Sequence, residues 1–369
     1  MRNKKLQVGL LAGIALAAII TPQFVAQAAP ASVQSAPAAV AAALGAEAFP
    51  QHRESTKKPL AGMRILMSND DSMQASRANG KDGIGLYDMR KSLCAAGADV
   101  VVIAPWGYMS GAGGSVTNSG QFTAAQRTTL PTGYESDCGS APSGGAVFGL
   151  CRGTACTADS LSATPADTVK FALHDGLKAL VGWTKAPDLV VTGINSGPNV
   201  SASINDSGTV GAALAAIDNE VPAVAFSGHV ESVSDLVTRP TYLAAADFGA
   251  QLIGQLRAKR LLTDDFVLNV NYPDVTNGQQ PGKPVWTRVG LGTFGVHTYT
   301  ASEEGSKTFT IGWAVCPADH CVDEPRRDAD STALFAGKIT LTALTRDRTL
   351  QTGEDSRLRR LVQSGQLLR

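Results

Sequence analysis

The chain has 369 residues, in which 32 Lys and Arg balance 32 Asp and Glu, and 44% of the residues are hydrophobic. A chain without net charge carries no electrostatic footprint for a nucleic-acid polymer, so any nucleotide that it binds is expected to be a small molecule. Beyond residue 28 the sequence offers no apolar stretch long enough to span a bilayer, so we expect no membrane partner for the mature protein.

Residues 1–28 have the layout of a secretory signal peptide. Basic residues precede an apolar run, and the closing A-Q-A triplet offers a cleavage site. A membrane anchor is the alternative, but the T-P-Q interruption at 21–23 and the A-x-A ending favour cleavage. Residues 29–60 are rich in Ala and Pro and are interpreted as a tether. We therefore expect an exported protein, either periplasmic or secreted.

Residues 61–275 are predicted to form an α/β core. An apolar strand stops abruptly at residues 69–71, a helical pattern follows over 84–93, and a β-branched strand follows over 100–103. Strand, helix and strand form the unit of a parallel sheet, and continuous apolar strands indicate a sheet that is covered on both faces. Further strands are predicted over 189–192, 223–226 and 266–270.

Two segments depart from this pattern. Residues 118–164 are rich in Gly, Ser and Thr and contain three cysteines, so we expect an insertion that lies outside the sheet. Residues 276–369 are β-like and turn-rich, with strands expected over 308–313 and 338–344 and an amphipathic helix over 356–368.

The six cysteines are expected to form disulfides, because an even number in an exported protein usually does. A zinc site is the alternative, and it is disfavoured because only His320 lies near a cysteine pair. The connectivity stays open. The candidate pairs are Cys316 with Cys321, Cys151 with Cys156, and Cys94 with Cys138.

Polar residues follow three predicted strands. Asp70 and Asp71 follow the first strand, Ser110 follows the second, and Asn195 follows a later one. Ligands of open α/β sheets bind at the carboxyl ends of the strands, and oxygen donors without soft neighbours suit Mg²⁺, Mn²⁺ or Ca²⁺. Two charged ligands leave the cation partly unneutralised, which favours an anionic substrate such as phosphate. The alternative is that Asp70 caps a helix or a turn.

The segment Ser207-Gly208-Thr209 stands where a small-residue helix is predicted to begin. Free N–H groups at a helix start can bind an anion. The alternative is an ordinary Ser N-cap, with Gly allowing close packing. The Gly-rich loop 110–115 could also bind phosphate, although it lacks the Walker ending.

Several segments, in family order, together resemble the SurE family, the survival-protein nucleotidases, and they span nearly the whole region after the tether. They are RILMSNDD (64–71), VVIAPWGYMSGAGGSVT (101–117), PDLVVTGINSGPNV (187–200), SGTVGAALAA (207–216), PAVAFS (222–227), LNVNYPD (268–274) and DADSTALFAGKITLTAL (328–344).

This resemblance implies a Rossmann-like three-layer core with a β-rich C-terminal oligomerisation segment, assembled as a homodimer or homotetramer. It implies a phosphomonoesterase that uses Mg²⁺ or Mn²⁺ to hydrolyse nucleoside 5′- and 3′-monophosphates. The metal ligands that it implies are Asp70, Asp71, Ser110 and Asn195, the four already selected from the strand ends. Asn69 joins the two Asp among the implied catalytic residues. The implied phosphate-binding residues are Asn69, Asn199, Ser207, Gly208 and Thr209.

The chain also departs from the family pattern. Ser72 replaces the Gly that usually follows NDD, Asp206 stands in a Tyr position, and Lys338 replaces a usual Tyr. These changes spare the metal ligands and affect base-binding and oligomer contacts. Two alternative functions therefore remain: an exported acid phosphatase with a broader or different phosphoester specificity, and a non-catalytic protein that binds nucleotides or anions.

Overall fold

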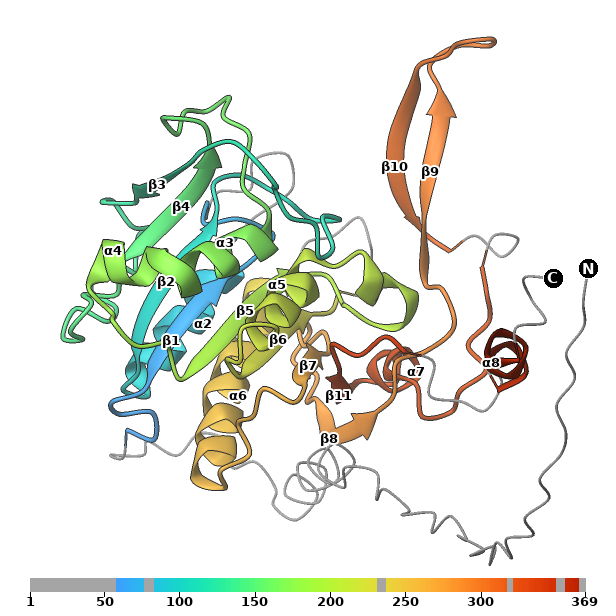
Figure 1. Cartoon of the computed structure of the whole chain (residues 1–369). Coiled ribbons are helices and arrows are strands. Elements are labelled where there is room, and N and C mark those ends of the chain that lie inside the picture. Colours follow the sequence, from blue (N-terminus) through green and yellow to red (C-terminus); the bar gives the residue numbers. More distant parts are fainter. Residues whose placement is uncertain (1–57, 76–82, 231–236, 317–320, 350–355, 365–369) are drawn as a thin grey trace, which may run out of the picture.

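The computed structural model describes residues 58–75, 83–230, 237–316, 321–349 and 356–364. The expected signal peptide and nearly all of the tether lie outside these ranges. Six consecutive parallel strands confirm the expected α/β fold with a mainly parallel sheet (Figure 1). In spatial order they are β4 (Val147–Arg152), β2 (Asp99–Pro105), β1 (Arg64–Ser68), β5 (Leu189–Ser196), β6 (Ala223–Gly228) and β7 (Val267–Tyr272).

Helices cover both faces of this sheet. On one face α2 (Ile84–Ala95) packs beside α6 (Arg239–Ala258), and on the other α3 (Pro165–Phe171) packs beside α5 (Gly208–Ile217). A π-helical turn at Ala172–Gly176 connects α3 to α4 (Leu177–Val181). Both faces are therefore apolar, which explains why every residue of β2 is buried. Within the described ranges, no helix has the length and apolar character to cross a bilayer.

The expectation that residues 118–164 lie outside the sheet is wrong. Strand β4 pairs parallel to β2, and β3 (Phe122–Gln126) pairs antiparallel to β4 and forms the edge of the sheet. The apolar run of β4 is short and lies between Gly-rich turns, so its sequence alone does not identify it as a strand. Pairing with the buried strand β2 places it in the sheet.

The sheet also continues past residue 275. Strand β11 (Lys338–Leu344) pairs antiparallel to β7, and β8 (Gly282–Thr287) pairs parallel to β11. Strands β9 (Gly295–Ala301) and β10 (Phe309–Val315) form a separate antiparallel hairpin that projects from the body (Figure 1). The remaining helices are α7 (Asp330–Phe335) and α8 (Ser356–Gln363), the latter within the expected amphipathic segment.

The cysteines are joined in the three candidate pairs. The disulfide Cys94–Cys138 ties α2 to the segment between β3 and β4, across 44 positions of sequence. The other two each close a short loop. They are Cys151–Cys156, at the end of β4, and Cys316–Cys321, after β10.

Candidate metal and phosphate site

Asp70 and Asp71 follow β1 at the carboxyl edge of the sheet and are almost fully buried, with 1% and 3% of their surface exposed. Oδ1 of Asp70 accepts a hydrogen bond of 2.5 Å from the Thr209 hydroxyl, and Oδ2 accepts one of 3.2 Å from the Thr209 backbone N–H. Oδ2 of Asp71 accepts a bond of 2.7 Å from Ser196 N–H. The first strand therefore delivers both carboxylates to partners on distant segments.

Burial dominates the electrostatics of Asp70. It raises the pKa of this carboxyl, and the hydrogen bonds from Thr209 and from Gly208 N–H oppose the rise because they favour the charged form. A divalent cation would favour the charged form further. A positively charged partner would therefore stabilise the ionised form of Asp70 in its buried position.

The start of α5 presses directly against Asp70. A Cβ atom on Gly208 would lie 2.9 Å from Cβ of Asp70 and 2.9 Å from Cγ of Pro165, so only glycine fits. Ser207 is the N-cap of this helix, and its hydroxyl accepts a 3.1 Å bond from Val210 N–H. The Ser207 side chain therefore caps the helix, as one of the two interpretations of this segment expected. The backbone N–H groups of the next two residues, Gly208 and Thr209, donate to Asp70.

Asn195 supplies the observation that fits a metal best. Its Nδ2 donates to the Gly197 carbonyl at 2.8 Å, whereas its buried Oδ1 has no hydrogen-bond partner among the described residues. Buried polar atoms rarely stay unpaired without a reason. The neighbouring Ser196 N–H donates to the Asp71 carboxylate, so the strand end that carries this open acceptor lies beside the segment of the two carboxylates. This donor set suits a hard cation.

The loop after β2 reaches the same place. Met109 N–H donates to the Asp70 carbonyl at 2.8 Å, which brings the adjacent Ser110 to the rim of the site as an exposed residue. Gly113 N–H donates to the Asp206 carbonyl at 3.0 Å. A Cβ atom on Gly211 of α5 would lie only 2.1 Å from the Gly113 carbonyl oxygen. The Gly-rich loop is thus packed tightly on the start of α5.

Asn69 and Asn199 connect strand ends along the carboxyl edge of the sheet. Asn69 donates to the Ile194 carbonyl at 3.2 Å and accepts a 3.4 Å bond from Asp71 N–H. Asn199 donates from its side chain to the Ser227 hydroxyl at 2.8 Å and from its backbone to Oδ1 of Asn271 at 2.7 Å. Their predicted contacts with phosphate stay predictions.

Sequence reasoning missed Tyr108. Burial raises its pKa to about 12, a hydrogen bond with Ser110 opposes the rise, and the charges of Asp71 and Asp70 add to it. The phenol therefore stays protonated beside the candidate metal ligands. The only signal in the sequence was its position two residues before Ser110, and a single Tyr in a loop is too common to be informative.

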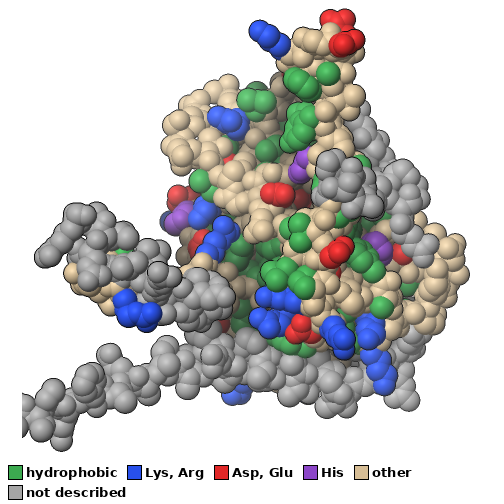
Figure 2. Space-filling model, turned by 90° about the vertical axis from the view of Figure 1, so that its right-hand side faces the viewer, with side chains coloured by type: hydrophobic (Ala, Val, Ile, Leu, Met, Phe, Trp, Pro, Cys, Tyr) green, Lys and Arg blue, Asp and Glu red, His purple; other side chains and the backbone are tan. Residues whose placement is uncertain are grey.

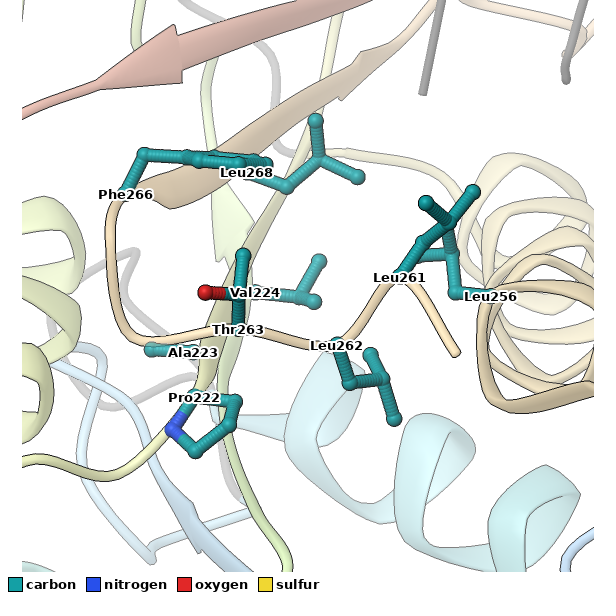
Figure 3. A pocket seen from close by; sticks show the side chains of 9 residues that line it. All are labelled: Pro222, Ala223, Val224, Leu256, Leu261, Leu262, Thr263, Phe266 and Leu268. Atoms are coloured by element: carbon teal, nitrogen blue, oxygen red, sulfur yellow. The ribbon is translucent and has the colours of Figure 1, made fainter. Parts of the chain in front are cut away.

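An apolar pocket lies at the opposite edge of the sheet, near the amino ends of β6 and β7 (Figure 3). Apart from Thr263 its lining side chains are apolar, which gives it no group for phosphate chemistry. In the described part of the chain, no three His, Cys, Asp or Glu side chains gather into a metal-binding group. A metal at the Asp70 and Asp71 site would need the uncharged oxygen donors described above.

Comparison with known proteins identifies the family of this chain. The family model for Survival protein SurE matches residues 65–295. A 5′-nucleotidase SurE of Microcystis aeruginosa is 33% identical over 229 residues, which cover 62% of this chain and 69% of the relative. That of Carboxydothermus hydrogenoformans is 29% identical over 288 residues, covering 78% and 92%. The crystal structure of the SurE protein from Aquifex aeolicus shares the fold, with a TM-score of 0.50, 22% identity, and coverage of 79% of this chain and 97% of that one. The chain belongs to the SurE family.

Proposed function

We propose that this protein is a metal-dependent phosphomonoesterase that hydrolyses nucleoside 5′- and 3′-monophosphates to nucleoside and phosphate. Two observations support the proposal. Curated relatives that match this chain over most of their own length bear the name 5′-nucleotidase SurE. The observation that carries the site assignment is the buried Asn195 oxygen without a hydrogen-bond partner among the described residues, on a strand end bonded through Ser196 to Asp71.

The residues that would hold the cation, Mg²⁺ or Mn²⁺, are Asp70, Asp71, Ser110 and Asn195. A bound divalent cation supplies Lewis-acid polarisation of a phosphoryl oxygen and lowers the pKa of bound water. Within the protein, Thr209 and Gly208 favour the ionised form of Asp70 through their hydrogen bonds. Asn69 bonds to Asp71 N–H and so helps to fix the turn that carries the two carboxylates.

The phosphate-binding residues that we propose are Asn69, Asn199, Ser207, Gly208 and Thr209. The first N–H groups of α5 are already bonded to Asp70 and Ser207, so this helix start acts on the phosphate through its positive dipole end. Phosphoryl transfer depends mostly on positioning and electrostatics, so the proposal needs no His or Cys nucleophile.

Phosphate release from adenosine 5′-monophosphate and from p-nitrophenyl phosphate, with and without a chelator, tests this function. We expect Asp70→Asn and Asp71→Asn to abolish metal-dependent turnover. Asp218→Asn is the matched control, because this exposed carboxylate lies at the far end of α5. Full activity in either site variant, or activity that ignores chelation, would refute the site.

A substrate panel separates the two alternatives. An exported acid phosphatase with a broader or different specificity would favour other phosphoesters over nucleotides. Ser72, which differs from the Gly of the family pattern, is the reason to test this alternative. A binding protein would show ligand-dependent stabilisation without any phosphate release.

We also propose export, to the periplasm or beyond the cell. The three disulfides support this proposal, because such bonds persist in oxidising compartments. Cells that express the full chain can be separated into cytoplasmic, periplasmic and extracellular fractions. The location of the protein and the N-terminal sequence of its mature form test the proposal. We expect the mature protein to begin at residue 29.

Assembly as a homodimer or homotetramer is part of the same proposal. The β9–β10 hairpin exposes Tyr299, Phe309 and Ile311, which are 65%, 53% and 71% exposed and lie on one face of the paired strands. Figure 2 shows hydrophobic side chains along the hairpin at the top of that view. A contiguous exposed apolar face of this kind marks a protein interaction site.

A further inference from the structure

A row of four aromatic rings links three segments that lie far apart in the sequence. His229 lies 5.3 Å from Phe335 between ring centroids, Phe335 lies 5.9 Å from Phe294, and Phe294 lies 5.7 Å from Trp313. Phe335 and Trp313 remain 50% and 43% exposed. We call these four residues the aromatic row. Its tilted contacts hold the rings in place and leave aromatic surface open to a ligand.

The aromatic row lies on the same edge of the sheet as the two carboxylates. His229 directly follows β6, and its backbone N–H donates to the Tyr272 carbonyl at the end of β7. Ser227, two residues earlier, is in register with Asn195 of β5. The candidate metal ligand and the start of the row are therefore on neighbouring strands.

Hydrogen bonds also tie α7, which carries Phe335, to the loop that follows Asn195. Ser201 N–H donates to Oδ1 of Asp330 at 3.1 Å, and the Ser201 and Ser331 hydroxyls are 2.8 Å apart. Oδ1 of Asp330 also accepts from Gly290 N–H at 3.0 Å, on the segment that leads to Phe294. The row is thus fixed to the candidate site by buried contacts.

The spacing across the sheet suits a nucleotide. Neighbouring strands lie nearly 5 Å apart, and β5 alone stands between β1, which precedes the carboxylates, and β6, which precedes His229. The two strand spacings together amount to about 10 Å. The distance from the phosphate to the base of a nucleoside monophosphate is of the same order. A phosphate at the carboxylates would therefore place its base near the row.

We propose that the aromatic row binds the nucleobase of the substrate by stacking, with Phe335 and Trp313 as its exposed platform. This inference rests on the proposed nucleotidase function. Every base has a π-face, so a stacking platform favours nucleotides over other phosphate esters and tolerates different bases. Burial lowers the pKa of His229, so its imidazole is neutral and the row presents aromatic surface rather than charge.

Matched substrates with and without a base test the proposal. In steady-state assays with Mn²⁺, we expect Phe335→Ala to raise KM for adenosine 5′-monophosphate about 5- to 150-fold, the range that follows from one lost stacking contact. KM for ribose 5-phosphate, which lacks the base, should not change. Phe335→Tyr should restore the wild-type KM, and Phe335→Leu should not.

Two controls separate binding from structure. Leu161→Ala removes an apolar side chain that is 68% exposed on another part of the molecule, and it should leave both KM values unchanged. Light scattering should give the same mass for Phe335→Ala as for the wild type. A changed mass, an unchanged KM for the nucleotide, or an equal rise for both substrates would overturn the proposal.

A binding measurement keeps this proposal distinct from the nucleotidase function. Adenosine, which has no phosphate, should quench tryptophan fluorescence of the metal-free protein, and Trp313→Phe should remove the quenching. If the wild type cleaves neither phosphate ester but still shows this quenching, the proposed function fails and the base site stands. If adenosine causes no quenching that depends on Trp313, the base site fails.

Discussion

The Thr209 hydroxyl favours the ionised form of Asp70 against the effect of burial, and its removal has a calculable effect. It donates to Oδ1 of Asp70 at 2.5 Å, and both residues are at most 1% exposed, so water cannot replace the lost bond. A hydrogen bond to a charged group contributes about 1.5–3 kcal/mol. We expect Thr209→Val to raise the pKa of Asp70 and to weaken metal binding about 10- to 150-fold, because the metal binds the ionised carboxylate.

Calorimetric titration of the metal-free protein with Mn²⁺ measures this effect. Thr209→Ser is the matched control, since serine keeps the donor and loses only a methyl group, and it should bind Mn²⁺ nearly as the wild type does. Thermal unfolding and circular dichroism verify that each variant is folded. Wild-type affinity in a folded Thr209→Val protein would refute the reasoning. So would an equal loss in both variants, because that would assign the effect to packing.

Three further predictions concern stability and assembly. Burial raises the pKa of Asp88 from 3.8 to about 6 despite bonds from Tyr134 and Arg239. The folded state therefore binds the proton more tightly than the unfolded state, and the free energy of unfolding should fall by about 3 kcal/mol as the pH rises from about 4 to above 6. Asp88→Asn should remove this slope in urea unfolding, and an unchanged slope would contradict the assignment. Replacing Cys94 and Cys138 by Ala should cost about 4 kcal/mol in the same assay, against about 2 kcal/mol for either short-loop disulfide, and equal losses would argue against the loop-length explanation. Ile311→Asp should lower the oligomer mass in light scattering, and a wild-type mass would exclude this face from the interface.

Much of the site could be predicted because a parallel sheet places all its carboxyl ends along one edge. The strand before Asp70 is recognisable from its apolar run, and the loops that carry Ser110 and Asn195 follow equally apolar strands. The structure brings these loops together through two hydrogen bonds, from Met109 N–H to the Asp70 carbonyl and from Ser196 N–H to the Asp71 carboxylate. Sheet topology therefore predicts which segments meet, although it does not predict the individual hydrogen bonds between them.

The sheet edges could not be predicted in the same way. Strand β4 contains only a short apolar run, and its neighbour β3 is partly exposed along most of its length. Strand β4 is placed by its pairing with β2 and β3 by its pairing with β4, and the pairing of β4 with β2 joins residues far apart in the sequence. Local patterns around Gly-rich turns do not contain that information.

The two capping alternatives have different outcomes, and together they define the site. Ser207 does cap α5, because its hydroxyl accepts from the N–H of Val210. Asp70 accepts instead from the N-terminal turn of a helix that begins almost 140 positions later, at a point where Gly208 leaves no room for a side chain. The anion at the start of α5 is therefore a carboxylate of the protein itself. Because these N–H groups already donate to Asp70, the helix stabilises the ionised form of this metal ligand directly. It can act on a phosphate only through its dipole. Changes at Thr209 should therefore alter metal affinity more than phosphate affinity.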